Sequence, residues 1–297
     1  MSAPQKQTFV QLACSRGVSQ RRACELCHLA RSTCRYERRP ARSDELVLES
    51  LLVERLQQFA QKRRRRGYRL AHHELRRDGF KVNHKRVYRL WKQHQLMVPA
   101  RRSRKKRRTG ASVSEVMATA PGQIWCLDFL EDRTITGGRV RVLCISDEFT
   151  RQSLAIVTGS SFRSERVCEV LEELCHQHGV PQMLRMDNGP EFIALALRGL
   201  CHRRGITLGF IAPGKPWQNG FAESFHARLR DEFLDGEVFW TVREAQVQLE
   251  RWRCYWNEER LHSSLSYATP DEFAARWVKS AHGETENVLR SLATTGS

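Results

Sequence analysis

Three acidic residues stand where a carboxylate is unusual. Asp128 lies inside the apolar run 124–130, where a charge is costly unless it binds a metal or a partner. Asp187 follows a short apolar segment, and Glu223 falls in the first turn of an expected helix. An Asp within a strand, an Asp at a strand end and a helix Glu form the hard oxygen ligand set that suits Mg²⁺ or Mn²⁺. Two such ions about 3.5–4 Å apart would stabilise the attacking and leaving oxygens of a phosphoryl displacement.

Each of these acids, taken alone, also has a structural explanation. Asp128 could cap a β-bulge, Asp187 could begin an Asx turn, and Glu223 could be a first-turn acid favoured by the helix dipole. The catalytic interpretation therefore depends on a fold that brings the three side chains together.

The elements expected around these acids form a mixed α/β sheet. Strands are predicted at 124–130, 140–146, 153–157, 182–186 and 207–211, and helices at 164–177, about 191–203, from 221, and at about 241–257. Three strands in a meander, followed by alternating helices and strands, are typical of a mixed sheet with flanking helices. Ligands of open α/β sheets gather at the carboxyl ends of strands, which is where Asp187 lies.

One segment carries the entire charge imbalance of the chain. The formal net charge is +17 over 297 residues, yet residues 62–108 alone hold 20 Lys and Arg against two acids, a net of +18. Such a concentrated positive field indicates a polyanionic partner. The sequence has no apolar run near the ~18 residues of a membrane span and no recognisable export signal, so we expect a cytoplasmic protein without a membrane partner.

Helical segments precede the expected sheet. Residues 1–40 fit a helix-turn-helix, although any small helical hairpin would give the same pattern. Its second helix would present to DNA Arg31, Ser32, Thr33 and Arg35. Residues 41–100 fit a second helical DNA-binding domain, in which Val87, Leu90 and Trp91 point inward. A basic linker, 101–118, follows with the expected phosphate contacts Arg101, Arg102, Arg104, Lys105 and Lys106.

The ten cysteines are interpreted as reduced thiols, most of them packed as small apolar side chains. The run from Cys24 to His28 matches the haem-attachment pattern, but that chemistry belongs to exported proteins. A zinc site built from this run and Cys34 is disfavoured, because Cys24 and Cys27 fall on the inward face of a short helix.

The motifs around the three acids resemble a known family. They are Trp125-Cys126-Leu127-Asp128, Asp187-Asn188-Gly189-Pro190-Glu191-Phe192 and Gly220-Phe221-Ala222-Glu223-Ser224-Phe225, with 35 residues between the second and third acids. The set resembles the DDE transposases and retroviral-type integrases, and within them the OrfB product of the bacterial "insertion sequence three" family. The segments 67–69, 82–90 and 257–270 extend the resemblance over nearly the whole chain.

The resemblance implies an RNase H-like catalytic core over 119–280, with a tail at 281–297. It makes Asp128, Asp187 and Glu223 the metal ligands, and it implies a DNA contact for Arg230, two helical turns beyond the Glu. Further DNA-contact candidates lie in the loop before that helix and in the second helical domain: Lys215, Trp217, Asn219, Tyr68, Arg69, Lys85 and Arg86. A buried hinge position is the alternative for Trp217.

The expected function is that of a transposase, which cleaves DNA strands and joins them to a target with two Mg²⁺ or Mn²⁺ ions as cofactors. The resemblance implies as partners double-stranded DNA, namely the terminal repeats of the element and its target, together with an OrfA product and further copies of this chain. Two alternatives stay open at this point. One is an RNase H-like nuclease without strand transfer, and the other is a catalytically inactive DNA-binding regulator.

Overall fold

The computed structural model describes residues 1–35, 43–63, 65–97, 117–212 and 220–278. The chain divides into two compact units, residues 1–54 and 55–297. Within the described ranges, no helix combines the length and the apolar character needed to cross a membrane.

The first unit is built from short helices. They are α1 (Ala3–Ser15), α2 (Gln20–Leu26) and α3 (Arg31–Arg35), followed by the first part of α4 (Ser43–Lys62). The Ser19 hydroxyl accepts a hydrogen bond from the Arg22 N–H at 3.3 Å and so caps α2. Val10, Ala23 and Cys24 form a small core, with further cysteines packed beside it.

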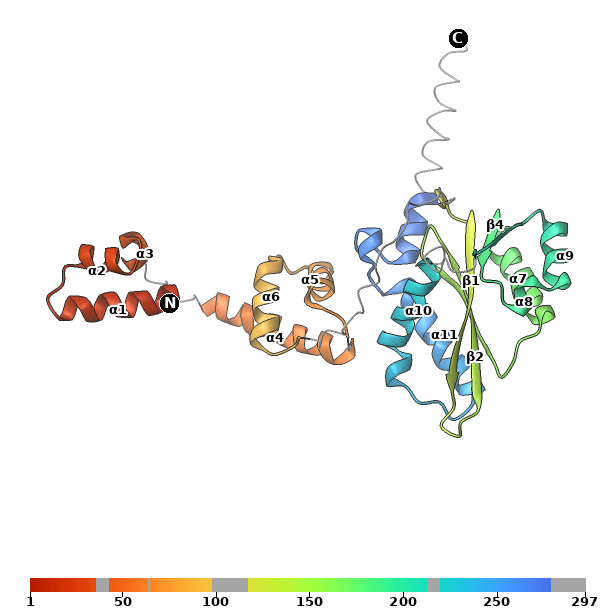
Figure 1. The fold of residues 1–297 in the computed structure, drawn as a ribbon, viewed down its shortest axis with the longest axis horizontal. Helices are drawn as coiled ribbons and strands as arrows, with labels where there is room; N and C mark the ends of the chain where they lie inside the picture. The colour runs from red at the N-terminus through yellow and green to blue at the C-terminus, as the bar shows by residue number, and fades with distance from the viewer. Residues whose placement is uncertain (36–42, 64, 98–116, 213–219, 279–297) are drawn as a thin grey trace, which may run out of the picture. The chain divides into compact units, whose positions relative to one another are not determined.

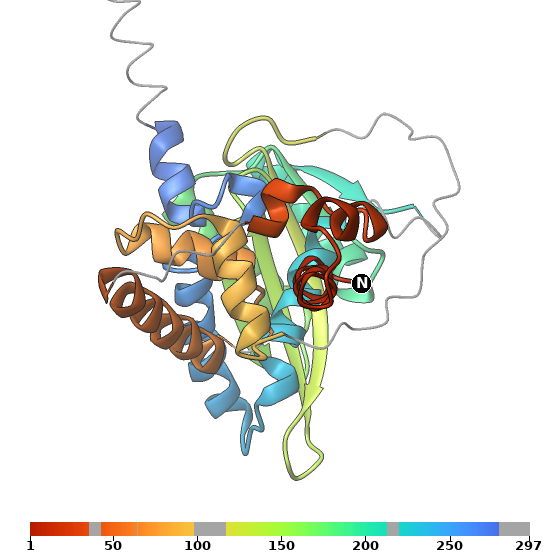
Figure 2. The ribbon, with the colours of Figure 1, turned by 90° about the vertical axis from the view of Figure 1, so that its left-hand side faces the viewer.

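The second unit begins with a helical segment. It contains the end of α4, then α5 (Tyr68–Arg77) and α6 (His84–Gln93), which pack against each other (Figure 2). Asn83 caps α6 by accepting the Lys85 N–H at 2.9 Å. The apolar spacing of α6 buries Val87, Leu90 and Trp91, as predicted.

The rest of the second unit is a five-stranded mixed sheet. Its strands are β1 (Ile124–Arg133), β2 (Arg139–Asp147), β3 (Ser153–Gly159), β4 (Met183–Met186) and β5 (Thr207–Phe210), in the order β3-β2-β1-β4-β5. The first three strands form an antiparallel meander, whereas β4 and β5 run parallel to β1. This order and these directions are those of the RNase H-like fold, so the expected fold class is confirmed.

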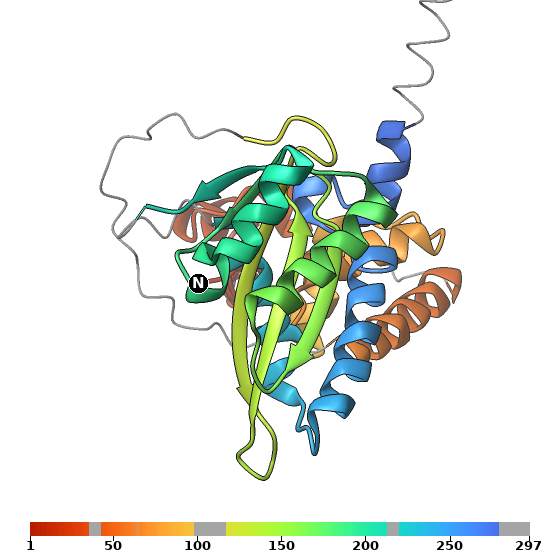
Figure 3. The same ribbon diagram turned by 90° about the vertical axis from the view of Figure 1, so that its right-hand side faces the viewer.

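Helices cover both faces of the sheet (Figure 1). On one face lie α7 (Ser164–His178), α8 (Pro190–Ile193) and α9 (Leu195–Arg204), and Figure 3 shows α7 and α9 lying across the strands. On the other face lie α10 (Gly220–Glu232) and α11 (Val242–Glu258). Two apolar cores result, because alternate residues of each strand point to opposite faces.

The prediction of a single helix at about 191–203 is wrong, because the structure has two helices there. Ala194 has extended backbone angles, φ −63° and ψ 148°, and divides the segment into α8 and α9. The break lets Phe192 enter the first core, where its ring stacks on that of Phe129 at a centroid distance of 5.1 Å. Burial of this aromatic side chain thus accompanies the interruption of the helix.

Candidate active site

Strand register places the first two acids side by side. In the parallel pair of β1 and β4, Cys126 faces Arg185, so the same register continued by two residues sets Asp128 beside Asp187. Leu184 and Met186 enter the core beneath α7 and α9. Asp187, at the alternate position, therefore shares with Asp128 the face of the sheet that α10 covers.

Asp128 is held in a half-enclosed position. Its side chain is 21% exposed, its Oδ1 accepts the Phe129 N–H at 2.8 Å, and its Oδ2 lies 3.5 Å from Nδ1 of His226. Burial, together with the negative charges of Asp187 and Glu223, raises the pKa of Asp128 to about 6 against the opposing effect of the Phe129 hydrogen bond. The pairing of β1 with β2 runs without a shift past Asp128, so the bulge-cap explanation is wrong.

Asp187 and Glu223 stand on exposed ends of their elements. The Asx turn foreseen as an alternative for Asp187 does form, since its Oδ1 accepts the Gly189 N–H at 2.9 Å. Glu223 lies in the first turn of α10, which buries Ala222, Phe225 and Leu229 against the sheet. Among the described residues, no three Asp, Glu, His or Cys side chains converge closely enough to coordinate one ion. The charges of Asp187 and Glu223 therefore act on Asp128, but the three side chains do not form a closed coordination site.

Sequence reasoning missed His226, one turn beyond Glu223 on α10. Burial and the charge of Arg230 lower the pKa of His226 to about 4, so its ring is neutral at pH 7 and can donate one hydrogen bond toward Asp128. Within the described part of the chain, its buried Nε2 has no hydrogen-bond partner. The spacing Glu-x-x-His, which puts both side chains on one helix face, is the signal that was available in the sequence.

Arg230 also lies on α10, but its described contact is with protein. Its Nη2 donates to the Glu131 carbonyl at 2.7 Å and so ties α10 to β1. The side chain remains exposed. A contact of Arg230 with a DNA phosphate stays a prediction.

The remaining sequence candidates have different settings. In the first unit, the α3 candidates Arg31, Ser32, Thr33 and Arg35 are exposed. In α5, the ring of Tyr68 packs against that of Tyr88 at a centroid distance of 4.8 Å, and Arg69 donates a hydrogen bond to the Tyr68 hydroxyl. Lys85 and Arg86 lie in the first turn of α6. Outside the described residues lie Lys215, Trp217, Asn219, Arg101, Arg102, Arg104, Lys105 and Lys106.

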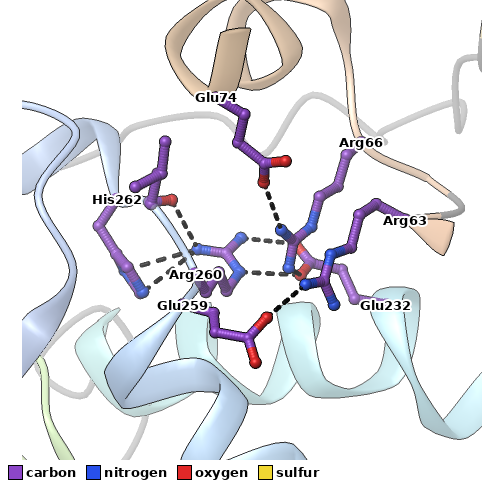
Figure 4. A network of polar contacts seen from close by, with 8 residues as sticks. Arg63, Arg66, Glu74, Glu232, Glu259, Arg260 and His262 are labelled. Atoms are coloured by element: carbon purple, nitrogen blue, oxygen red, sulfur yellow. Dashed lines mark hydrogen bonds and ion pairs between the residues drawn. The ribbon is translucent and has the colours of Figure 1, made fainter. Parts of the chain in front are cut away.

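Several arginines of the basic tract are paired within the protein. Glu232 at the end of α10 accepts hydrogen bonds from Arg66, at 3.0 Å, and from Arg260, at 2.8 Å (Figure 4). Burial opposes ionisation of Glu232, but the hydrogen bonds and charges of these two arginines lower its pKa to about 2. We call this trio the docking network. Its side chains are at most 7% exposed.

Outer ion pairs flank the docking network. Arg63 pairs with Glu259 at 2.6 Å, Arg65 with Asp231 at 2.8 Å, and Arg77 with Glu272 at 2.5 Å. Net charge alone predicts that these arginines belong to a binding site for a polyanion. The structure shows that their nearest anions are carboxylates of the catalytic core, so the field available to DNA is smaller than the count suggests.

Comparison with known proteins gives a consistent result. Models described as an integrase core domain match residues 118–216 and 204–270, and one described as an HTH-like domain matches residues 48–105. The insertion element IS407 31.7 kDa protein of Burkholderia multivorans is 38% identical over 262 residues, which cover 87% of this chain and 91% of that protein. The transposase of insertion sequence element IS904 from Lactococcus lactis is 27% identical, covering 67% of this chain and 83% of that one.

Solved structures show a more distant likeness. The HTLV-2 integrase catalytic core domain in complex with magnesium aligns with a TM-score of 0.42 at 16% identity, covering 52% of this chain and 98% of that domain. The family assignment depends on the sequence relatives and the family models. This chain belongs to the insertion-sequence transposases with an integrase-type core, in the class of the OrfB products of the "insertion sequence three" family, and is a DDE polynucleotidyl transferase.

Proposed function

We propose that Asp128, Asp187 and Glu223 bind the divalent metal of this transposase, as two Mg²⁺ or Mn²⁺ ions. The observation that carries the proposal is the strand register that sets Asp128 beside Asp187, on the sheet face that α10 and its Glu223 cover. The negative charges of Asp187 and Glu223 add to the effect of burial in raising the pKa of Asp128. Carboxylate oxygens are the ligands that these cations prefer, and a bound cation would relieve the repulsion. Asp187 and Glu223 are exposed, so rotation of their side chains toward Asp128 has little packing to overcome.

Bound metal would supply Lewis-acid stabilisation of the phosphodiester oxygens during cleavage and during joining of the 3′ end to target DNA. The chain's own contribution is positioning. The Phe129 N–H and the neutral His226 ring orient the Asp128 carboxylate. The bond from Arg230 to the Glu131 carbonyl holds the helix that bears Glu223 against β1. Neither reaction needs a Ser or Tyr nucleophile, because water or a DNA 3′-OH attacks directly.

The helical segments before residue 98 are proposed to hold the element ends. The exposed face of α3 supplies one set of contacts, and the first turn of α6 with Lys85 supplies another. The likeness to OrfB products supports an OrfA partner and a multimer that holds two ends at once. In such a complex each chain would engage both its own terminal repeat and target DNA.

The test compares two Asp-to-Asn variants on the same strand, Asp128→Asn and Asp132→Asn. The substrate is duplex DNA carrying the ends of the element that encodes this chain, with Mg²⁺ and a target plasmid. Asp128→Asn should lose both cleavage and joining while it retains binding to the ends, because it removes a ligand and little else. Asp132→Asn, four residues along β1, should keep all three activities.

The same assay separates the alternatives. Full turnover by Asp128→Asn would refute the metal-site proposal. Cleavage by the unaltered chain without any joined product would identify a nuclease. Binding to the ends without either reaction would identify a regulator.

A further inference from the structure

A cavity of about 820 Å³ lies in the second unit beside the catalytic helix. The segment 65–70, the end of β2, one side of α10 and the stretch 260–264 all contribute to its wall. Among the described residues, its lining contains seven arginines against two carboxylates. The cavity keeps an excess of positive charge, although four of these arginines are paired with carboxylates: Arg66 and Arg260 with Glu232, Arg65 with Asp231, and Arg185 with Glu148.

Two buried guanidinium nitrogens in this lining lack hydrogen-bond partners among the described residues. They are Nη1 of Arg66 and Nη1 of Arg151. The nearest carboxylate oxygen to the first belongs to Glu74, at 4.0 Å. Burying a charged donor without an acceptor costs at least about 1–3 kcal/mol. A phosphate oxygen is an acceptor that would suit either nitrogen, because planar guanidinium groups bind phosphate well.

Aromatic rings give the cavity a second chemical character. Tyr68, Phe221, Trp256 and Tyr267 all line it. The Arg151 guanidinium lies 3.7 Å from the centroid of the Phe221 ring, and the Arg260 guanidinium lies 4.6 Å from that of Trp256. Arginines interleaved with aromatic rings form the surface on which unpaired bases stack while their phosphates are neutralised. The cavity volume is large enough for a single nucleotide.

The cavity wall contains residues that are close in sequence to two of the acids. Arg185, in its wall, stands two residues before Asp187 and points to the same sheet face, so the two positions are roughly 6.6 Å apart along β4. Ser224, also in the wall, follows Glu223 directly. A DNA strand with one phosphate at the acids can thus place a neighbouring nucleotide in the cavity.

We propose that this cavity receives one unpaired nucleotide of the DNA substrate, adjacent to the reacting phosphodiester. Its phosphate is held by arginines of the lining, Arg151 among them, and its base stacks among the aromatic rings. The inference rests on the proposed function, because it requires DNA at the three acids. Pulling a base out of a duplex costs a few kcal/mol, so a mismatch that frees this nucleotide should strengthen binding.

The experiment uses the full chain and element-end duplexes in three forms, with the nucleotide next to the cleavage site paired, mismatched or abasic. The unaltered protein should bind the mismatched duplex at least tenfold more tightly than the paired one. Arg151→Gln should lose most of that gain, whereas Arg243→Gln, an exposed arginine of α11 outside the lining, should retain it. A photoreactive 5-iodouracil at the freed position should cross-link to peptides containing Tyr68, Phe221 or Tyr267.

Two further variants keep the test independent of folding and of catalysis. Arg228→Gln alters an exposed lining residue and should also reduce the mismatch gain. The test therefore remains possible if the Arg151 variant does not fold. Asp128→Asn should retain both the gain and the cross-link. If Asp128→Asn cleaves DNA normally yet keeps them, the metal proposal fails and the cavity assignment stands.

Three results would overturn the cavity assignment. The first is an equal mismatch gain in the unaltered protein and both lining variants. The second is a set of cross-links confined to peptides outside the cavity. The third is an abasic duplex that binds as tightly as the mismatched one, because a site for phosphate alone would not sense the base.

Discussion

Replacing Asp128 with Asn should stabilise the metal-free protein while it abolishes catalysis. Burial and two neighbouring charges raise the pKa of Asp128 from an ordinary value of 3.8 to about 6 in the folded chain. The folded state therefore holds this proton more tightly than the unfolded state does. The contribution of this proton to the free energy of unfolding is fully present below pH 3.8 and is lost as the pH rises through about 6.

The size of the effect follows from the shift in pKa. One pKa unit corresponds to about 1.4 kcal/mol, so the rise to about 6 is worth about 3 kcal/mol at neutral pH. The side chain is 21% exposed, and solvent screening reduces the expected gain to about 2 kcal/mol. Asn keeps an oxygen for the Phe129 N–H, so little is lost in exchange. For a unit of this size the melting temperature should rise by roughly 4–8 °C.

The assay is thermal and denaturant unfolding with a chelator present, at pH 7.5 and at pH 5. The difference between Asp128→Asn and the unaltered chain should fall to about half at pH 5, because folded Asp128 is then mostly protonated. Mg²⁺ should stabilise the unaltered chain and not the variant. The electrostatic reasoning would be refuted if Asp128→Asn were no more stable than the unaltered chain at pH 7.5. It would also be refuted if the difference in stability between the two proteins were the same at pH 7.5 and pH 5.

Two other predictions concern the arginines. Glu232→Gln leaves Arg66 and Arg260 buried without a counter-charge and should lower the free energy of unfolding by about 3–5 kcal/mol. A denaturant titration measures this, and unchanged stability would contradict the proposed role of the docking network. Replacing the linker residues Arg101, Arg102, Arg104, Lys105 and Lys106 with Gln should make the slope of log affinity against log salt shallower by about 4.5, and an equal slope would exclude them as phosphate contacts.

Local sequence patterns predicted the positions of the acids well. The apolar run around Asp128 is a strand because its alternate residues enter two cores, and the Asn-Gly after Asp187 marks a strand end. The helix that carries Glu223 begins at Gly220, one residue earlier than expected. These features depend on residues close in the chain, so a single sequence contains their signal.

Partners distant in the chain could not be predicted in the same way. The acids that pair with Arg65 and Arg66 lie 166 residues further on, and no spacing rule connects them. The basic tract therefore looked like an uncompensated charge. The contact of His226 with Asp128, and the cavity that Arg151 lines, likewise arise only once strand and helix are packed together.

Helix α10 has a catalytic candidate at one end and the docking network at the other. Glu232 lies nine positions after Glu223, which is about 13.5 Å of continuous helix. A displacement of the segment bearing Arg66 would therefore act on the same continuous helix that carries Glu223, so the proposed DNA contacts before residue 98 and the proposed metal site are connected through one helix.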